Sequence, residues 1–431
     1  MAITYATRAA LNFGRYQRRT EYLAMRGDHA ANLLRVRQPS DPFPIYERIR
    51  EQGEVYRSRL GVLCTVSQPL CRSVTTDARF GALPPAPGRP DWTVGRDDQT
   101  RLVHPIERSL LSLDPPDHTR LRHLVSPWFT PRALNARAPR IRAIIGRLLD
   151  GVADRGEFDL VSQVSKYVPF EILRDMMDIS TDDRDRLIWW AGVLVNAVDG
   201  PHTMTERRAV HTALVEMTAF FATLVAQRRR APGDDLVSAV VRDADDEEAV
   251  ALLGLVFIAG QPTAACLLNN CVRLLLEHPE QKELLLADPD IAPNVVEESL
   301  RYDPSGRLIV RLAAEDSTVR GHDIPAGSIL IHFIAGANRD PGVFTDPHRY
   351  DVTRQNSREH VTFSGGAHHC IGAGLARLQA EIMVGEVFTR FPDLQLAGRP
   401  RMSATRGHRS PTTLPLRVGR TRSVPGPGRN G

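Results

Sequence analysis

The stretch from residue 243 to residue 278 constrains the fold more than any other part of this 431-residue chain. It reads DADDEEAVALLGLVFIAGQPTAACLLNNCVRLLLEH and predicts one long helix. The helix begins with acidic residues suited to its dipole and ends at His278-Pro279. Because its middle is apolar on every face, it must be surrounded by other protein. We therefore expect a large core built around one buried helix.

The segments on either side of this helix predict further helices and a few short strands. A helix opens at residues 41–44, and residues 55–67 alternate like a strand hairpin that turns at Gly61. The pattern from 117 to about 230 is helical. Later segments predict one more helix and three strands, at 291–302, 307–313, 317–321 and 328–336. The expected fold class is mainly α with small β-sheets.

Charge and composition exclude several classes of protein. The formal net charge of +4 is too small to indicate nucleic-acid binding, which usually shows as a clustered basic stripe. Five cysteines without paired spacing do not suggest a disulfide framework. No secretory signal is visible, and the longest apolar stretch, residues 250–259, is about half a membrane span. We expect a soluble, cytoplasmic protein that binds neither nucleic acid nor membrane.

A glycine-rich loop around a single cysteine is the strongest chemical signal. In FSGGAHHCIGAGLAR (363–377), Cys370 stands just before a predicted helix, whose dipole and backbone N–H groups favour the thiolate. Glycines at 365, 366 and 372 would let the backbone approach a flat, bulky group. The thiol alone is equally compatible with a buried structural cysteine. A zinc site from His368, His369 and Cys370 is weakly supported, because consecutive residues cannot close a tetrahedron.

The spacing of this loop resembles the haem-binding loop of the cytochrome P450 family. The matching positions are Phe363, Gly366, His368, Cys370, Gly372, Leu375, Ala376 and Arg377. The resemblance implies that Cys370 ligates the iron of haem b, held between the long central helix and the helix after the cysteine loop. A thiolate ligand pushes electron density onto iron and favours O–O cleavage.

The resemblance covers nearly the whole chain and implies a single catalytic domain. We divide the chain into a basic N-terminal leader (1–38), a haem-thiolate domain (39–417) and a disordered basic tail (418–431). After Asp393 no acidic residue occurs, while eight arginines do.

A second motif concerns the support of the cysteine loop. Glu298 and Arg301 stand three residues apart on one helix face, which alone would suggest a solvated ion pair. By resemblance they form a buried structural triad with an arginine from the meander before the loop, for which we expect Arg349. Truncating one member of such a network is costly.

A third set of residues would hold the haem carboxylates. His118 and Arg122 lie four residues apart and share a helix face. By resemblance they bind the propionates together with Arg311 and His368. Buried carboxylates need such cationic or donor partners.

The central helix departs from the family at one position. Where the family carries Ala-Gly-x-(Asp/Glu)-Thr, this chain has Ala259, Gly260, Gln261, Pro262 and Thr263. The small residues leave room for dioxygen, and Thr263 keeps an alcohol for proton delivery. Pro262 replaces the acid and frees the carbonyl four residues back, at Ile258.

Several reactions remain open from this pattern. Hydroxylation of a secondary metabolite, a polyketide or peptide, would use protons arriving through water, Gln261 and Thr263. Oxidative coupling of aromatic groups is the alternative, because it depends less on oxygen insertion. A peroxide-driven enzyme is disfavoured by the retained Thr263, and a haem sensor without turnover by Thr263 and the Ala-Gly notch. Electrons would come from a separate ferredoxin and its reductase.

Two segments are expected to cover the distal pocket. One is the Pro/Gly-rich loop at 81–100, and the other spans about 189–205, with two tryptophans near a Gly-Pro break. The residues expected to line the pocket floor are Ile258, Ala259, Thr263, Leu308 and Ile309.

Overall fold

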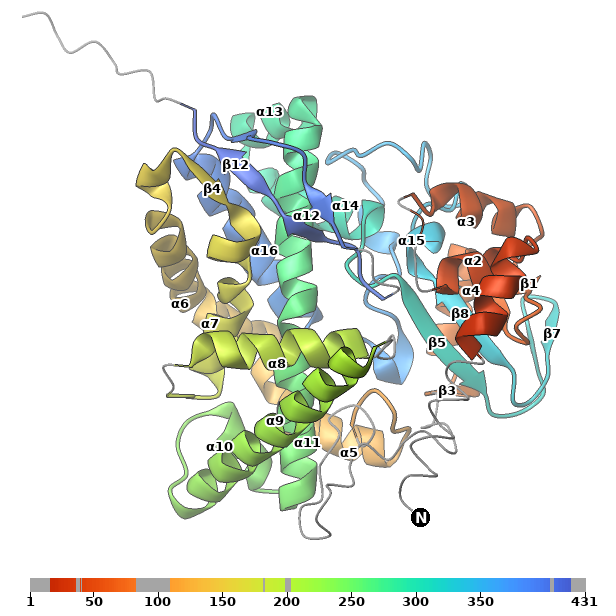
Figure 1. Ribbon diagram of the computed structural model, residues 1–431, viewed down its shortest axis with the longest axis horizontal. Helices are drawn as coiled ribbons and strands as arrows, with labels where there is room; N and C mark the ends of the chain where they lie inside the picture. The colour runs from red at the N-terminus through yellow and green to blue at the C-terminus, as the bar shows by residue number, and fades with distance from the viewer. Residues whose placement is uncertain are drawn as a thin grey trace, which may run out of the picture.

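The computed structural model describes residues 16–35, 39, 41–82, 109–180, 183–197, 203–403 and 407–419 (Figure 1). A first helical stretch runs over residues 16–25. The further helices are α2 (His29–Leu34), α3 (Phe43–Arg50), α4 (Gln68–Thr76), α5 (Asp117–Val125), α6 (Pro131–Asp150), α7 (Tyr167–Met176), α8 (Arg184–Asn196), α9 (Met204–Arg230), α10 (Leu236–Val241), α11 (Asp246–Gly260), α12 (Pro262–Glu277), α13 (Pro279–Ala287), α14 (Ala292–Tyr302), α15 (Ile334–Ala337) and α16 (Ala373–Arg390). The strands are β1 (Tyr56–Arg57), β2 (Leu63–Thr65), β3 (Phe80–Gly81), β4 (Glu157–Asp159), β5 (Leu308–Ala313), β6 (Ser317–Val319), β7 (His322–Ile324), β8 (Ile329–Phe333), β9 (Gln395–Leu396), β10 (Arg401–Met402), β11 (Pro411–Thr413) and β12 (Pro415–Arg417). The expected class, mainly α with small sheets, is confirmed.

The central helix is two helices with one break. A capping box between Asp245 and Glu248 starts α11, and every residue from 249 to 258 is buried. The helix ends at Gly260, Gln261 adopts ψ −68°, and α12 starts at Pro262. The expected long helical run is therefore two helices, with the break beside Pro262, where the sequence predicted a local opening because proline has no N–H to continue the hydrogen bonding. The two parts still run end to end through the middle of the molecule (Figure 1).

Two helical segments are long and apolar enough to meet the length and hydropathy criteria for a membrane span. They are residues 204–230 and the combined stretch 246–277. In the second, 72% of the most apolar window is buried inside the protein, as a core helix requires.

A five-stranded sheet of order β1-β2-β8-β5-β3 lies beside this helical body (Figure 1). The expected hairpin is confirmed: β1 and β2 pair antiparallel, and Gly61 has φ +89° in their turn. Strand β8 pairs with β2 on one side and β5 on the other, which places Ile309 opposite His332 and Arg311 opposite Leu330.

Part of the expected leader belongs to the folded domain. Residues 24–34 pack with α3, β2 and β8 in one apolar cluster. Buried Asp28 accepts hydrogen bonds from Ala31 N (2.8 Å), Ser58 Oγ (2.9 Å) and Arg59 N (2.7 Å). This carboxylate caps α2 and ties it to the loop after β1. Residues 1–15 and 420–431 lie outside the described parts of the chain.

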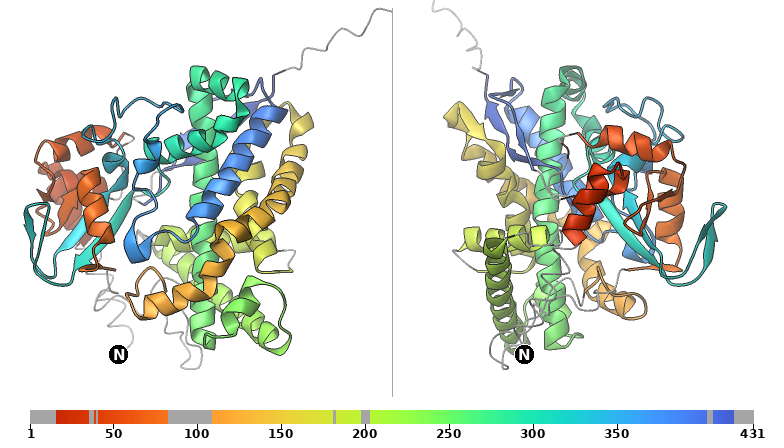
Figure 2. Two further views of the ribbon diagram at one scale, coloured as in Figure 1. Left: turned by 180° about the vertical axis from the view of Figure 1, so that it is seen from behind. Right: turned by 45° about the vertical axis from the view of Figure 1, so that its right-hand side comes forward.

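The cysteine loop is held between the sheet and the helical body. It leads into α16, which packs against α6, α12 and α14. Seen from behind, α16 lies between α12 and α6 (Figure 2). The loop is therefore held on two sides. The long helix α16 follows it in the chain, and α4 and the sheet contact its first half.

Candidate functional site

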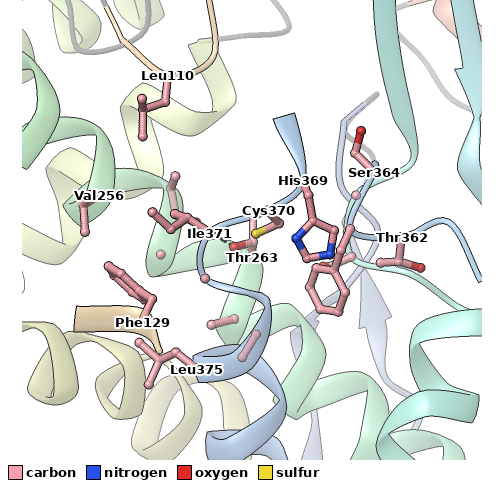
Figure 3. A pocket seen from close by; sticks show the side chains of 18 of the residues that line it. Leu110, Phe129, Val256, Thr263, Thr362, Ser364, His369, Cys370, Ile371 and Leu375 are labelled. Carbon is pink, nitrogen blue, oxygen red and sulfur yellow. Dashed lines mark hydrogen bonds between the residues drawn. The ribbon is translucent and has the colours of Figure 1, made fainter. Parts of the chain in front are cut away.

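Cys370 presents its sulfur to a cavity from the end of the glycine-rich loop (Figure 3). Its backbone N–H donates to Phe363 O at 2.9 Å, which closes the loop. The backbone N–H groups of Gly372 and Ala373, at the start of α16, point at the sulfur. The structure thus provides the N–H environment that the sequence predicted.

The pKa of Cys370 shifts in the opposite direction from our expectation. Desolvation raises the pKa of the thiol, and the N–H donors together with the charges of Arg122 and Arg377 offset this only in part. The N–H donors and the two arginines act in the direction that the sequence predicted, but burial outweighs them. A coordinated metal ion would deprotonate a ligating thiol outright.

Two of the loop glycines, Gly365 and Gly366, are required by close packing within the protein. Gly366 has φ +62°, and a Cβ there would stand 2.6 Å from Thr75 O at the end of α4. A Cβ at Gly365 would stand 3.0 Å from Thr75 Oγ1, whereas one at Gly372 would make only an ordinary contact with the Cys370 sulfur. Close packing of the loop on α4 therefore requires glycine at 365 and 366.

The cavity lies between the cysteine loop and the break in the central helix. Its volume is about 330 Å³, at the lower end of the roughly 300–1,000 Å³ typical of ligand pockets. Thr263, Ala259 and Gly260 line it at the helix break, and β5 contributes Ile309. Other walls come from Leu110, Leu173, Leu255, Val256 and Leu267.

Two expected floor residues do not line this cavity. Ile258 is 1% exposed and faces the core between the helices. Leu308 packs against the N-terminal cluster on the other face of the sheet. The prediction is wrong for both, because one residue of helix rotation or strand alternation turns a side chain away. Leu255, Val256 and Ile309 are the residues that take part.

At the helix break, the Thr263 side chain lines the cavity and the Gln261 side chain does not. Thr263 lines the cavity, and its hydroxyl donates to Ala259 O at 2.6 Å. Gln261 is buried outside the cavity lining, and its Nε2 donates to Phe257 O at 3.2 Å. The structure therefore does not support the expected proton route through Gln261. A Cβ on Gly260 would meet Leu173 Cδ1 at 3.0 Å, which explains the small residue there.

The four expected carboxylate-binding residues lie at one edge of the cavity. Arg122 and His368 line it, and the rings of His118 and His368 have centroids 4.6 Å apart. Arg311 donates through its terminal nitrogens to Val310 O (3.0 Å) and to Ser364 Oγ (2.9 Å) in the cysteine loop.

His368 is already paired within the protein. Its Nδ1 lies 3.2 Å from Leu110 O and its Nε2 lies 2.9 Å from Asp114 Oδ1. Asp114 also accepts from Ala82 N at 3.0 Å, so it links β3 to the cysteine loop. His368 thus has no ring nitrogen left for a propionate, and its expected role is not supported. The sequence analysis did not single out Asp114.

A family model described as cytochrome P450 matches residues 216–403. A Mycobacterium tuberculosis protein that carries the name cytochrome P450 140 is 36% identical over 419 residues, covering 93% of this chain and 95% of the relative. The chain belongs to the cytochrome P450 family. The 6-deoxyerythronolide B hydroxylase of Saccharopolyspora erythraea is 38% identical, with 66% of this chain and 70% of the relative covered. The solved structure of the cytochrome P450 CxnD, described as an enzyme for C–S bond formation in chuangxinmycin biosynthesis, superimposes with TM-score 0.79 and 32% identity over 88% of this chain and 95% of that one.

The residues present fit the thiolate-ligated haem of a cytochrome P450. Both ring nitrogens of His118 and the Nε of Arg311 are buried without a partner among the described residues. Desolvation, with smaller effects from the charges of His368 and Arg122, lowers the pKa of His118 to about 4, so its ring is neutral. Unpaired buried donors are costly, and the two haem carboxylates would satisfy them. Cys370 would supply the sulfur ligand of the iron. The described residues contain no cluster of three metal-ligating side chains, so zinc at this loop is not supported.

The cytochrome P450 structural triad is present, but with a different third member. Glu298 and Arg301 form a fully buried pair, with Arg301 Nε 2.7 Å from Glu298 Oε2. Arg354, not Arg349, completes it, with Nε 3.4 Å from Glu298 Oε1. The Arg349 side chain is exposed, and only its carbonyl takes part, accepting from Arg301 at 3.0 Å. The prediction of Arg349 is therefore wrong.

A second buried network beside the triad was missed. Glu297 accepts from Arg377 Nε at 2.6 Å and lies 3.1 Å from His360 Nε2. Although desolvation raises it, these two hydrogen bonds lower the pKa of Glu297 to about 2. Arg377 also stacks on Phe363 with its guanidinium carbon 4.6 Å from the ring centre. This network braces the first residue of the loop, and the only sequence signal was the Glu297-Glu298 doublet.

The two expected covering segments are described only in part. Residues 83–108 and 198–202 lie outside the described chain, so most of the predicted loop at 81–100 is not placed. Trp190 is buried against Phe220 and donates to Glu216 at 2.7 Å, and Trp189 stacks beneath Arg186. Neither tryptophan lines the cavity, so their proposed role as a cover is not supported.

Proposed function

We propose that this cytochrome P450 hydroxylates an apolar secondary metabolite of the polyketide or peptide class. The carrying observation is the apolar lining of the cavity into which Cys370 projects: it includes Leu110, Leu173, Leu255, Val256 and Ile309. Such a lining selects an apolar substrate and excludes water from the reacting carbon. The similarity to 6-deoxyerythronolide B hydroxylase supports the same reaction type.

The haem, when bound, supplies dioxygen activation, and its thiolate ligand favours O–O cleavage. The chain's own contribution is made by Thr263. A hydroxyl can donate one hydrogen bond and accept two. Because the Thr263 proton is held by Ala259 O, its oxygen is free to accept from a water in the cavity. Thr263 would thus hold a proton-bearing water beside the iron, without help from a neighbouring carboxylate.

The electrons are proposed to come from a separate ferredoxin and its reductase. The test combines the haem-loaded protein with a surrogate ferredoxin, its reductase and NADH, and screens macrolactones and cyclic peptides. A substrate should accelerate NADH consumption and give a product heavier by one oxygen. Thr263→Ala should consume NADH with less product, and Thr263→Ser should restore product. NADH consumption that no substrate accelerates, with no product, would contradict the proposal and favour a haem sensor.

Oxidative coupling is a second candidate, favoured by two observations. Pro262 occupies the place of the usual acid, and the similar enzyme CxnD is described as forming a C–S bond. A coupling enzyme would give a product lighter by two hydrogens instead of heavier by one oxygen. Mass spectrometry of the same reactions therefore distinguishes the two.

A further inference from the structure

His332 is a buried histidine that the site described above leaves unexplained. It lies in the middle of β8 with 0% exposure, and both ring nitrogens lack a partner among the described residues. Desolvation, followed by the charge of Arg311, lowers the pKa of His332 to about 3. The ring is therefore neutral and has one N–H donor and one acceptor nitrogen to satisfy.

Leaving both nitrogens unpaired is expensive. A buried polar group without a partner costs roughly 1–3 kcal/mol. The sheet itself offers little relief, because the strand neighbours of His332 are Ile309 and Thr65, and Thr65 Oγ1 already accepts from Ser67 N at 2.9 Å. An aliphatic residue at this position would avoid the cost, as Leu330 and Ile331 do beside it.

The register of the sheet places His332 toward the haem site. Directly opposed residues of adjacent strands share a face, and so do residues two apart in one strand. His332 therefore shares a face with Ile309, which lines the cavity, and with Arg311. The opposite face, which carries Leu308, Val310 and Phe333, packs on the N-terminal cluster.

Three side chains near the haem site carry buried nitrogens without a partner among the described residues. His118 packs against His368, Arg311 contacts Ser364 in the cysteine loop, and His332 shares the sheet face of Arg311. His118 and Arg311 already fit the haem carboxylates, and the Arg311 charge acts on His332. A single anionic group beside Arg311 would therefore also give His332 a partner.

We infer that His332 is a further cofactor-positioning residue, which joins Arg311 to the haem carboxylate that Arg311 binds. Neither group has a direct partner among the described residues, so the acceptor nitrogen of His332 would take the hydrogen of Arg311 Nε across one buried water. The N–H of His332 would serve the carboxylate, directly or across a second water. This inference rests on the placement of a propionate at Arg311. By this inference β8 contributes to haem retention, in addition to the cysteine loop and the helix that carries His118 and Arg122.

The test compares haem-loaded wild type with His332→Leu and His332→Gln. Leucine removes both polar groups at similar volume, whereas glutamine keeps one donor and one acceptor. Haem transfer to apomyoglobin should be roughly tenfold faster in His332→Leu, on the order of one hydrogen bond to a charged group, and within about twofold of wild type in His332→Gln. The Fe(III)/Fe(II) potential of His332→Leu should fall, because a carboxylate that loses a donor favours the more positive ferric state.

Leu330→Val is the matched control, since it removes one methylene from the same face of β8. It should lower the stability to denaturant without changing haem transfer or the potential. Should His332→Leu yield no haem-loaded protein, His332→Met takes its place with the same expected results. Wild-type haem transfer and potential in the apolar variant would overturn the inference, as would a His332→Gln variant that behaves like the apolar one. Loss of the same effects in an Arg311→Gln background supports the role through Arg311. A wild-type haem-transfer rate in Arg311→Gln itself would instead refute the underlying propionate placement.

Discussion

We predict that Arg354, and not Arg349, stabilises the meander that precedes the cysteine loop, so that its loss lowers the free energy of unfolding. The two residues are five apart, and sequence reasoning chose the wrong one. Arg354 donates to Thr345 O at 2.7 Å and to Asp346 O at 3.2 Å, and it pairs with Glu298 at 3.4 Å. Its side chain is 8% exposed and that of Glu298 is 0% exposed.

These contacts set the size of the effect. Removing one partner of a buried ion pair costs roughly 3–5 kcal/mol. Glu298 keeps Arg301 and the Asp351 N–H at 2.9 Å, so the lower end, about 3 kcal/mol, applies to Arg354→Ala. Arg349→Ala removes an exposed side chain and leaves the accepting carbonyl in place, so it should stay within about 0.5 kcal/mol of wild type.

The assay is guanidinium unfolding of the haem-loaded protein, followed by circular dichroism and by the carbon-monoxide difference spectrum. Arg354→Ala should unfold at lower denaturant and give less haem-loaded protein on expression. Arg349→Ala is the matched control, because it changes the same residue type in the same segment. Equal losses in the two variants, or a larger loss in Arg349→Ala, would refute the reasoning.

Three further predictions follow from the same structure. Cys370→Ala should lose the red-shifted Soret band of the reduced, carbon-monoxide-bound protein, and a retained band would show that another residue ligates iron. Pro262→Glu should alter the outcome of the reaction: a hydroxylase should waste fewer electrons, whereas a coupling enzyme should leak product heavier by one oxygen. Unchanged product and coupling efficiency would mean that Pro262 is mechanistically neutral. Glu297, whose pKa is about 2 in the folded protein against roughly 4.3 when unfolded, should stabilise the fold fully above about pH 4.3. The stability advantage of wild type over Glu297→Gln in urea should therefore shrink as the pH falls toward 2, and a pH-independent difference would contradict the assigned network.

The cysteine loop shows how far local sequence reaches. Its spacing singled out Cys370 and indicated the family without any tertiary information, because the matching residues stand at fixed offsets along the chain. The hairpin at Gly61 and the buried stretch 249–258 were predicted for the same reason: turn chemistry and an all-round apolar pattern are local properties. The local opening at Pro262 was likewise predicted from the missing N–H.

What the sequence could not determine is which side chains meet across the fold. Arg349 and Arg354 are the same residue type in the same segment, so the sequence does not distinguish them. Only the path of the meander brings Arg354 to Glu298. Ile258 and Val256 are equally apolar, and only the rotation of α11 against its neighbours turns one toward the cavity. Glycine is required at 365 and 366 because Thr75 in α4, almost 300 residues away in the chain, packs closely against them. Periodicity and motif spacing describe single elements, whereas contacts depend on how those elements are packed together. The sequence by itself therefore determined the family, the candidate iron ligand and the buried central stretch, and tertiary packing alone decided the partners that hold them in place.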